Sequence, residues 1–234
     1  YTSADSVLQI AVHQDSFGLN RLYELCQLAL EIFSTLRVQR VIARPFLGDN
    51  KDNFYRTKAR KDFILPPVSE TTCDRIISSG RKCLGIGKIG DIFSNRGITS
   101  SIFGKSDSLL FEDMLDVISG AMEGDLIFAN FVEFDTLYGH KRDVSGYAKA
   151  LEDFDKKLPK LFSILDEEDL LIITADHGND PTFHGSDHTR EQVPVLIRNR
   201  NFNNKNYGLV KFSDIGATMS NFLGVAPVNG TIIR

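Results

Sequence analysis

Strand-like apolar segments alternate with helix-like amphipathic segments along the chain. Tyr1–Val12 and Val38–Leu47 are rich in apolar and β-branched residues, which is typical of strands, and Leu19–Leu36 repeats apolar residues at helical spacing. Further strands are predicted at Cys83–Ile86, Asp125–Phe131, Asp169–Thr174 and Val193–Ile197. Further helices are predicted from Thr71 or Thr72 to Ile77, over Ser106–Ser119, over Val144–Leu165 with an interruption near Pro159, and over Phe212–Phe222.

This order of elements predicts the α/β class. Asp125–Phe131 and Asp169–Thr174 are apolar at nearly every position, so both faces of these strands are expected to be covered. Strands of this kind, alternating with helices, indicate a mostly parallel sheet flanked by helices.

A linker is predicted at Pro66-Pro67, because two prolines stiffen the backbone and disfavour helix. It separates residues 1–67 from residues 68–234. The chain also opens inside a predicted strand, and domains rarely open in this way. We therefore expect a further segment upstream of Tyr1.

Composition restricts the partners and the location. The chain has 234 residues, a net charge of −4 and 42% hydrophobic residues, so it can form a sizeable core and has no basic excess for nucleic acid or an anionic membrane. No apolar run approaches the roughly 20 residues that span a bilayer, and no signal peptide is visible. Three cysteines without close pairing fit a reducing compartment, so a cytoplasmic location is expected.

Candidate metal ligands follow two of the apolar strands. Asp135 and His140 come after Asp125–Phe131, while Asp176 and His177 come after Asp169–Thr174. His188, with Asp187 beside it, lies a little further on, and four of the five histidines fall in this stretch. Ligands of parallel sheets collect past the carboxyl ends of the strands, so we expect these side chains to converge. The ordinary alternative is a set of capped turns with solvated histidines.

The ligand types indicate particular chemistry. Carboxylates and imidazoles without cysteine suit Mn²⁺, Zn²⁺ or similar ions. Five ligands exceed the needs of one catalytic ion, and a pair of ions is typical of phosphoryl transfer. Basic residues that could receive a phosphate are Arg44, Arg56, Lys58, Arg60 and Lys88. A solvated basic face is the alternative for the run from Arg56, whereas Lys88 lies among glycines that permit close approach, without P-loop spacing.

Several motifs, taken together, resemble the phosphopentomutase family of the alkaline phosphatase superfamily. They are Y-T-S-A-D-S-V-L-Q-I-A, V-I-A-R-P-F, G-K-I-G-D-I-F, F-D-T-L-Y-G-H-K-R-D, L-L-I-I-T-A-D-H-G-N-D-P-T, D-H-T-R-E and F-S-D-I-G-A-T. The resemblance covers nearly the whole chain and implies an alkaline-phosphatase-like core at residues 68–234. It also implies a smaller, partial α/β cap domain at residues 1–67, so that the chain looks like a C-terminal portion.

The resemblance further implies two Mn²⁺ ions, although other divalent ions are compatible. One ion is expected on Asp135, His140 and His188, and the other on Asp176 and His177. A nucleophilic threonine and a further aspartate ligand are expected upstream of Tyr1, so no catalytic residue is assigned within this chain and the chain alone is expected to be inactive. Substrate contacts are expected from Ser3, Asp5, Arg44, Arg60 and Lys88.

The activity implied by the resemblance is an isomerase reaction. It interconverts ribose 1-phosphate and ribose 5-phosphate, and the deoxyribose pair, through a phosphoenzyme. The alternatives are a related metal-dependent phosphatase, a phosphoglycerate mutase, or a non-catalytic protein that binds metal or sugar phosphate.

Overall fold

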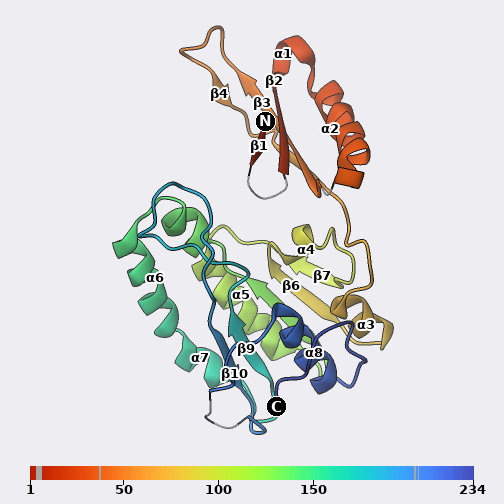
Figure 1. The fold of residues 1–234 in the computed structure, drawn as a ribbon, viewed down its shortest axis with the longest axis vertical. Coiled ribbons are helices and arrows are strands. Elements are labelled where there is room, and N and C mark those ends of the chain that lie inside the picture. The colour runs from red at the N-terminus through yellow and green to blue at the C-terminus, as the bar shows by residue number, and fades with distance from the viewer. Residues whose placement is uncertain (4–6, 37, 203, 205) are drawn as a thin grey trace. The chain divides into compact units, whose positions relative to one another are not determined.

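The computed structural model describes residues 1–3, 7–36, 38–202, 204 and 206–234, with only the backbone of Ser3 included. The chain divides into two compact units, Tyr1–Val68 and Ser69–Arg234, and each unit has its own sheet (Figure 1). The predicted linker Pro66-Pro67 lies at the end of the first unit. The assignment of residues 1–67 to a cap and of residues 68–234 to a core stays a prediction.

The first unit is a five-stranded sheet with one long helix against it. Its strands are β1 (Thr2–Ser3), β2 (Val7–His13), β3 (Arg40–Leu47), β4 (Tyr55–Arg56) and β5 (Lys61–Ile64). The helices between β2 and β3 are α1 (Gln14–Phe17), α2 (Leu19–Phe33) and the 3₁₀ turn η1 (Ser34–Leu36). β2 and β3 are parallel, whereas β1 pairs antiparallel with β2, and β4 and β5 both pair antiparallel with β3.

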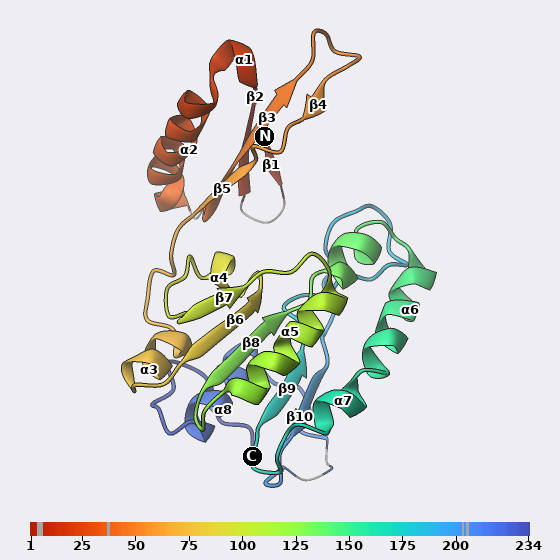
Figure 2. The same cartoon turned by 180° about the vertical axis from the view of Figure 1, so that it is seen from behind.

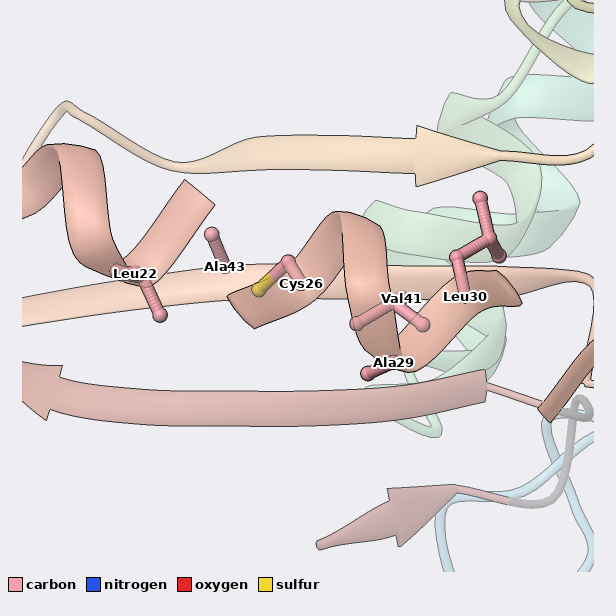
Figure 3. Close-up of a cluster of buried hydrophobic side chains, with 6 residues drawn as sticks. All are labelled: Leu22, Cys26, Ala29, Leu30, Val41 and Ala43. Carbon is pink, nitrogen blue, oxygen red and sulfur yellow. The ribbon is translucent and has the colours of Figure 1, made fainter. Parts of the chain in front are cut away.

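Helix α2 is held to the sheet by one apolar stripe. Leu22, Cys26 and Leu30 recur at intervals of four residues and are at most 3% exposed. They form a core cluster with Val41 and Ala43 of β3 (Figure 3). The stripe therefore explains why this segment is helical, as its spacing predicted.

The second unit contains a parallel sheet and a separate antiparallel pair. Its strands are β6 (Cys83–Gly87), β7 (Ser100–Ile102), β8 (Leu126–Asn130), β9 (Leu171–Thr174) and β10 (Val195–Arg198). Its helices are α3 (Thr72–Ser78), α4 (Ile89–Ile92), α5 (Asp107–Gly120), the π-helix η2 (Phe134–Gly139), α6 (Val144–Asp155), α7 (Leu158–Phe162) and α8 (Phe212–Phe222). The parallel sheet has the order β7-β6-β8, and β9 pairs antiparallel with β10.

The α/β prediction of a parallel sheet flanked by helices is confirmed for β7-β6-β8. Helix α5 lies on the face turned toward the viewer in Figure 2, and α8 lies on the face seen in Figure 1. Phe111 and Leu115 of α5 share a buried cluster with Ile86 of β6 and Leu161 of α7. The strand predicted at Val193–Ile197, observed as β10, runs antiparallel to β9.

Helix boundaries follow the expected capping chemistry. Thr71 caps α3 in a capping box with Asp74, and Ser106 caps α5 through the N–H of Leu109. The long helix predicted from Val144 is divided into α6 and α7, with Pro159 in the first turn of α7, where a missing N–H is tolerated. None of the helices in the described parts of the chain is long and apolar enough to cross a membrane.

Candidate metal centre

Asp135, His140 and His188 converge on one point. Each contributes one ligand atom, and these three atoms all lie within 4.8 Å of one another. His140 Nε2 is 3.2 Å from Asp135 Oδ2, and His188 Nε2 is 3.4 Å from Asp135 Oδ1. The side chains are 27%, 36% and 26% exposed, in the order Asp135, His140 and His188, so the cluster is open to solvent on one side. The structure thus brings together the three residues predicted to share one ion.

The π-helix η2 brings the first two of these residues together. The N–H of His140 donates to the carbonyl oxygen of Asp135 at 2.9 Å, which is an i→i+5 bond. In an α-helix, with about 100° per residue, residues five apart point about 140° away from each other. The wider π turn reduces this divergence, so the D-x-x-x-x-H spacing forms a ligand pair. Short π segments of this kind are frequent at functional sites.

His140 is oriented for an ion by its second ring nitrogen. Its Nδ1 is 2.5 Å from the carbonyl oxygen of Ser186. A carbonyl only accepts, so Nδ1 carries the proton in the neutral ring, and the lone pair of Nε2 faces Asp135. A lone pair beside a carboxylate is repulsive unless a proton or a metal ion lies between them, and a ring whose other nitrogen bonds a carbonyl is common among histidine ligands of metals. The donor set therefore fits a divalent ion.

Asp107, at the start of α5, holds the backbone that directly precedes η2. Its carboxylate accepts the backbone N–H groups of Val132 at 3.0 Å and Glu133 at 2.8 Å. Burial raises the pKa of Asp107 above the usual aspartate range, although the two N–H donors act in the opposite direction. Asp107 therefore joins α5 to the segment that carries Asp135.

The other predicted ligands, Asp176 and His177, lie beside this cluster. The ring of His177 stacks on that of His188 with centroids 3.7 Å apart. His177 Nε2 is 3.8 Å from Asp176 Oδ1, and the Asp176 side chain is 67% exposed. Among the described residues, this pair does not belong to a set of three converging ligands. Its assignment to a second ion stays a prediction.

Backbone contacts tie the two ligand loops together. Gly178 and Thr189 form an isolated antiparallel bridge, and the N–H of Thr189 donates to Gly178 at 3.0 Å. Thr189 Oγ1 also accepts the N–H of Asp180 at 2.7 Å. This bridge holds His188 next to the loop of His177. Asp187 and His184 are exposed, and the ring of His184 lies tilted against that of Phe183.

Two residues at the site, Arg142 and Asn179, were not predicted. Asn179 Nδ2 donates to Asp135 Oδ1 at 2.6 Å, and Arg142 donates to Asn179 Oδ1 at 2.5 Å. Both lie inside the motifs that supplied the ligands. Their position within those motifs is the only sequence signal, because neither is a typical metal ligand.

The predicted substrate residues occur in both units. Arg44 of β3 hydrogen-bonds Gln9 at 2.9 Å, and together with Arg56 it lines a hollow of about 380 Å³ in the first unit. Burial lowers the pKa of Arg44, and repulsion from Arg60 and Arg56 lowers it further, so an anion here would be stabilised.

Arg60 is already bound to Asp62 through two hydrogen bonds of 2.8 Å. Hydrogen bonding to Asp62 raises the pKa of Arg60. Lys88 is exposed at the carboxyl end of β6 in the second unit. The side chain of Ser3 and all of Asp5 lie outside the described residues.

The chain belongs to a family of metal-dependent enzymes. Residues 87–227 match the model of the Metalloenzyme superfamily, which is therefore the family of this chain. The matched range contains Asp135, His140 and His188. Membership and the converging triad together indicate the use of a divalent metal.

Eight curated relatives that are 45–51% identical to this chain carry one name. A phosphopentomutase of Sinorhizobium fredii is 51% identical over 228 residues, which are 97% of this chain and 56% of the relative. Phosphopentomutases of Chelativorans sp. and Chromohalobacter salexigens are 49% and 47% identical and cover 96% and 97% of this chain. The alignments span 55% and 56% of these two relatives, so the chain spans about half the length of the curated relatives it matches. The resemblance inferred from the motifs is confirmed.

A solved structure from Pyrococcus horikoshii aligns with 76% of this chain and 52% of its own chain. The TM-score is 0.48 and the sequence identity is 15%. A similarity this limited adds nothing to the assignment.

Proposed function

We propose that the protein acts as a phosphopentomutase, interconverting ribose 1-phosphate and ribose 5-phosphate and the corresponding deoxyribose phosphates. The observation that carries the proposal is the convergence of Asp135, His140 and His188 in a member of the Metalloenzyme superfamily. The shared name of relatives at 45–51% identity supports the substrate class.

A divalent ion at this triad would neutralise negative charge that develops during phosphoryl transfer. The residues of the chain hold the ion and fix its surroundings. Asp135 supplies the compensating charge, and the hydrogen bond from His140 to Ser186 keeps the Nε2 lone pair directed toward the carboxylate. The triad is partly exposed, which leaves room for further ligands, as catalytic sites require.

We assign two Mn²⁺ ions to the complete site, the second with Asp176 and His177 as ligands. The stack of His177 on His188 supports this assignment because it places the second pair directly beside the first. The ligand types, oxygen and nitrogen without sulfur, also suit Mn²⁺.

Arg44 and Lys88 are proposed to bind phosphate groups of the substrate. Arg44 fits this role, since its partner Gln9 is neutral and the repulsion from nearby arginines would be relieved by an anion. Lys88 is exposed between the end of β6 and the start of α4, so its ammonium group is accessible to a ligand in solvent. Arg60 is a weaker candidate because Asp62 already neutralises it. Ser3 and Asp5 stay predictions, as does a cap role for residues 1–67.

The test is an assay of the full-length protein with ribose 1-phosphate and Mn²⁺. Formation of ribose 5-phosphate is the expected result. Release of free phosphate without ribose 5-phosphate would identify a phosphatase. Turnover of phosphoglycerate alone would identify a phosphoglycerate mutase, and metal binding without turnover would leave only a binding role.

A further inference from the structure

Arg142 connects the chain segments that carry the predicted ligands. Its guanidinium donates to the carbonyl oxygens of Gly139, Asp180, Gly185 and Asp187 at distances between 2.5 and 3.0 Å. Gly139 directly precedes the ligand His140, and Asp187 directly precedes the ligand His188. One planar side chain with donors in a fixed fork therefore sets the relative position of three segments.

Asn179 extends this contact to the ligand Asp135. Its side-chain oxygen accepts from Arg142 Nη1 at 2.5 Å, and its side-chain nitrogen donates to Asp135 Oδ1 at 2.6 Å. The orientation of the amide follows from chemistry, because a guanidinium only donates and a carboxylate only accepts. Asn179 is 8% exposed, so its hydrogen bonds are protected from competing water.

The backbone is shaped to admit this amide. A Cβ atom at Gly139 would lie 2.5 Å from Asn179 Nδ2 and 2.7 Å from its Cγ. These separations are too short for any side chain. Gly139 therefore lets Asn179 reach Asp135 across the end of η2.

We propose that Arg142 and Asn179 are positioning residues for the metal centre. Asn179 holds the Asp135 carboxylate in one orientation, and Arg142 holds both Asn179 and the segment ending at His188. Neither residue contacts the ion. The inference rests on the proposed metal centre, because it concerns the orientation of the ligands of that centre. Partners that orient metal ligands typically contribute about 10–100-fold to metal affinity.

The experiment measures Mn²⁺ binding by calorimetry in the full-length protein, at a temperature where circular dichroism shows every variant to be folded. Arg142→Gln and Asn179→Ala are each expected to weaken binding by about 10–100-fold. The double variant is expected to lose less than the product of the two effects, because the residues act in one chain of hydrogen bonds. Arg200→Gln is the matched control, since Arg200 forms an exposed ion pair with Glu168.

Arg142→Lys separates charge from geometry. A lysine keeps the positive charge but replaces the fork by a single ammonium group, so affinity is expected to stay low. Recovery of wild-type affinity in this variant would overturn the proposed role of the guanidinium. A fall in the melting temperature of the ion-free protein with unchanged Mn²⁺ affinity would show a merely structural role and would equally overturn the inference.

Asp135→Asn distinguishes failure of the inference from failure of the metal centre. If the wild type binds no Mn²⁺, or if Asp135→Asn binds it as the wild type does, the proposed metal centre is wrong. If Asp135→Asn loses the triad ion while Arg142→Gln and Asn179→Ala bind within about twofold of the wild type, against the expected loss, only the positioning role is wrong.

Discussion

The imidazole rings of His177 and His188 stack face to face, with centroids 3.7 Å apart and an interplanar angle of 21°. His188 is one of the three converging ligands, whereas His177 belongs to the adjacent pair with Asp176. The stack therefore joins the two predicted ion sites, and replacing either histidine tests how far their occupancies are coupled.

Replacement of single histidines should remove the ions selectively. We expect two Mn²⁺ ions per full-length wild-type chain and one ion in His177→Ala, because the triad remains. His188→Ala should lose the triad ion and weaken the second site through loss of the stack. Elemental analysis after gel filtration measures the ion content. His184→Ala is the control, since His184 is exposed and its ring lies only against that of Phe183 among the ring contacts described, and a loss of metal in this control would contradict the ligand assignment.

Gly139→Ala should destabilise the site locally. The new methyl group would collide with the Asn179 side chain, and overpacking of this kind costs about 1–3 kcal/mol. Gly120→Ala is the matched control, because a Cβ at the end of α5 meets nothing within 4 Å. The control should gain up to about 1 kcal/mol through reduced entropy of the unfolded chain. Urea unfolding measures both, and equal stabilities of the two variants would contradict the close approach at Gly139.

Two leucines of α2 should differ sharply on truncation. Leu22 is fully buried against the sheet, so Leu22→Ala should lower the free energy of unfolding of the first unit by about 2–5 kcal/mol. Leu28 lies on the same helix and is 52% exposed, so Leu28→Ala should cost far less. Chemical denaturation monitored by circular dichroism provides the comparison. Similar losses in both variants would mean that the buried face of α2 is not the one described.

The stability contributed by Asp214 should depend on pH. Its carboxylate accepts the backbone N–H groups of Lys211 at 2.9 Å and Thr231 at 2.8 Å, and these bonds lower its pKa. A lowered folded-state pKa gives stability that is fully present above the unfolded pKa of about 3.9 and is lost as the pH falls through the folded value. The stability difference between wild type and Asp214→Asn should therefore be constant near neutral pH and shrink in acid. Urea midpoints across this range measure it, and a difference independent of pH would contradict the mechanism.

Much of the fold was predictable because local signals agreed with it. Phe212–Phe222 has helical periodicity and forms α8 over that range. Ser106 and Thr71 mark helix starts because their side chains satisfy exposed N–H groups. The direction of β10 was not predictable from its apolar pattern. The apolar pattern of a strand indicates which of its faces are buried. It does not indicate the direction of pairing, because that depends on the course of the loop before the strand.

The part of the site that was predictable consists of residue types that commonly bind metals. Aspartate and histidine after apolar strands indicated Asp135, His140 and His188, and the structure brings these three together. Asn179 and Arg142 carry no comparable mark, because asparagine and arginine occur widely in polar loops. Their roles follow only from distances between segments that are about 40 residues apart in sequence, such as the contact from Arg142 to Asn179.

The i→i+5 turn between Asp135 and His140 also constrains how this segment can change over evolutionary time. A π turn differs from an α turn by one surplus residue per turn. In an α-helix with no deletion, the two side chains would diverge by about 140°. Deletion of one residue between them would leave a spacing of four, which an α-helix places on one face. A related chain is therefore expected to keep this ligand pair with either spacing, provided that the turn type changes together with the number of residues.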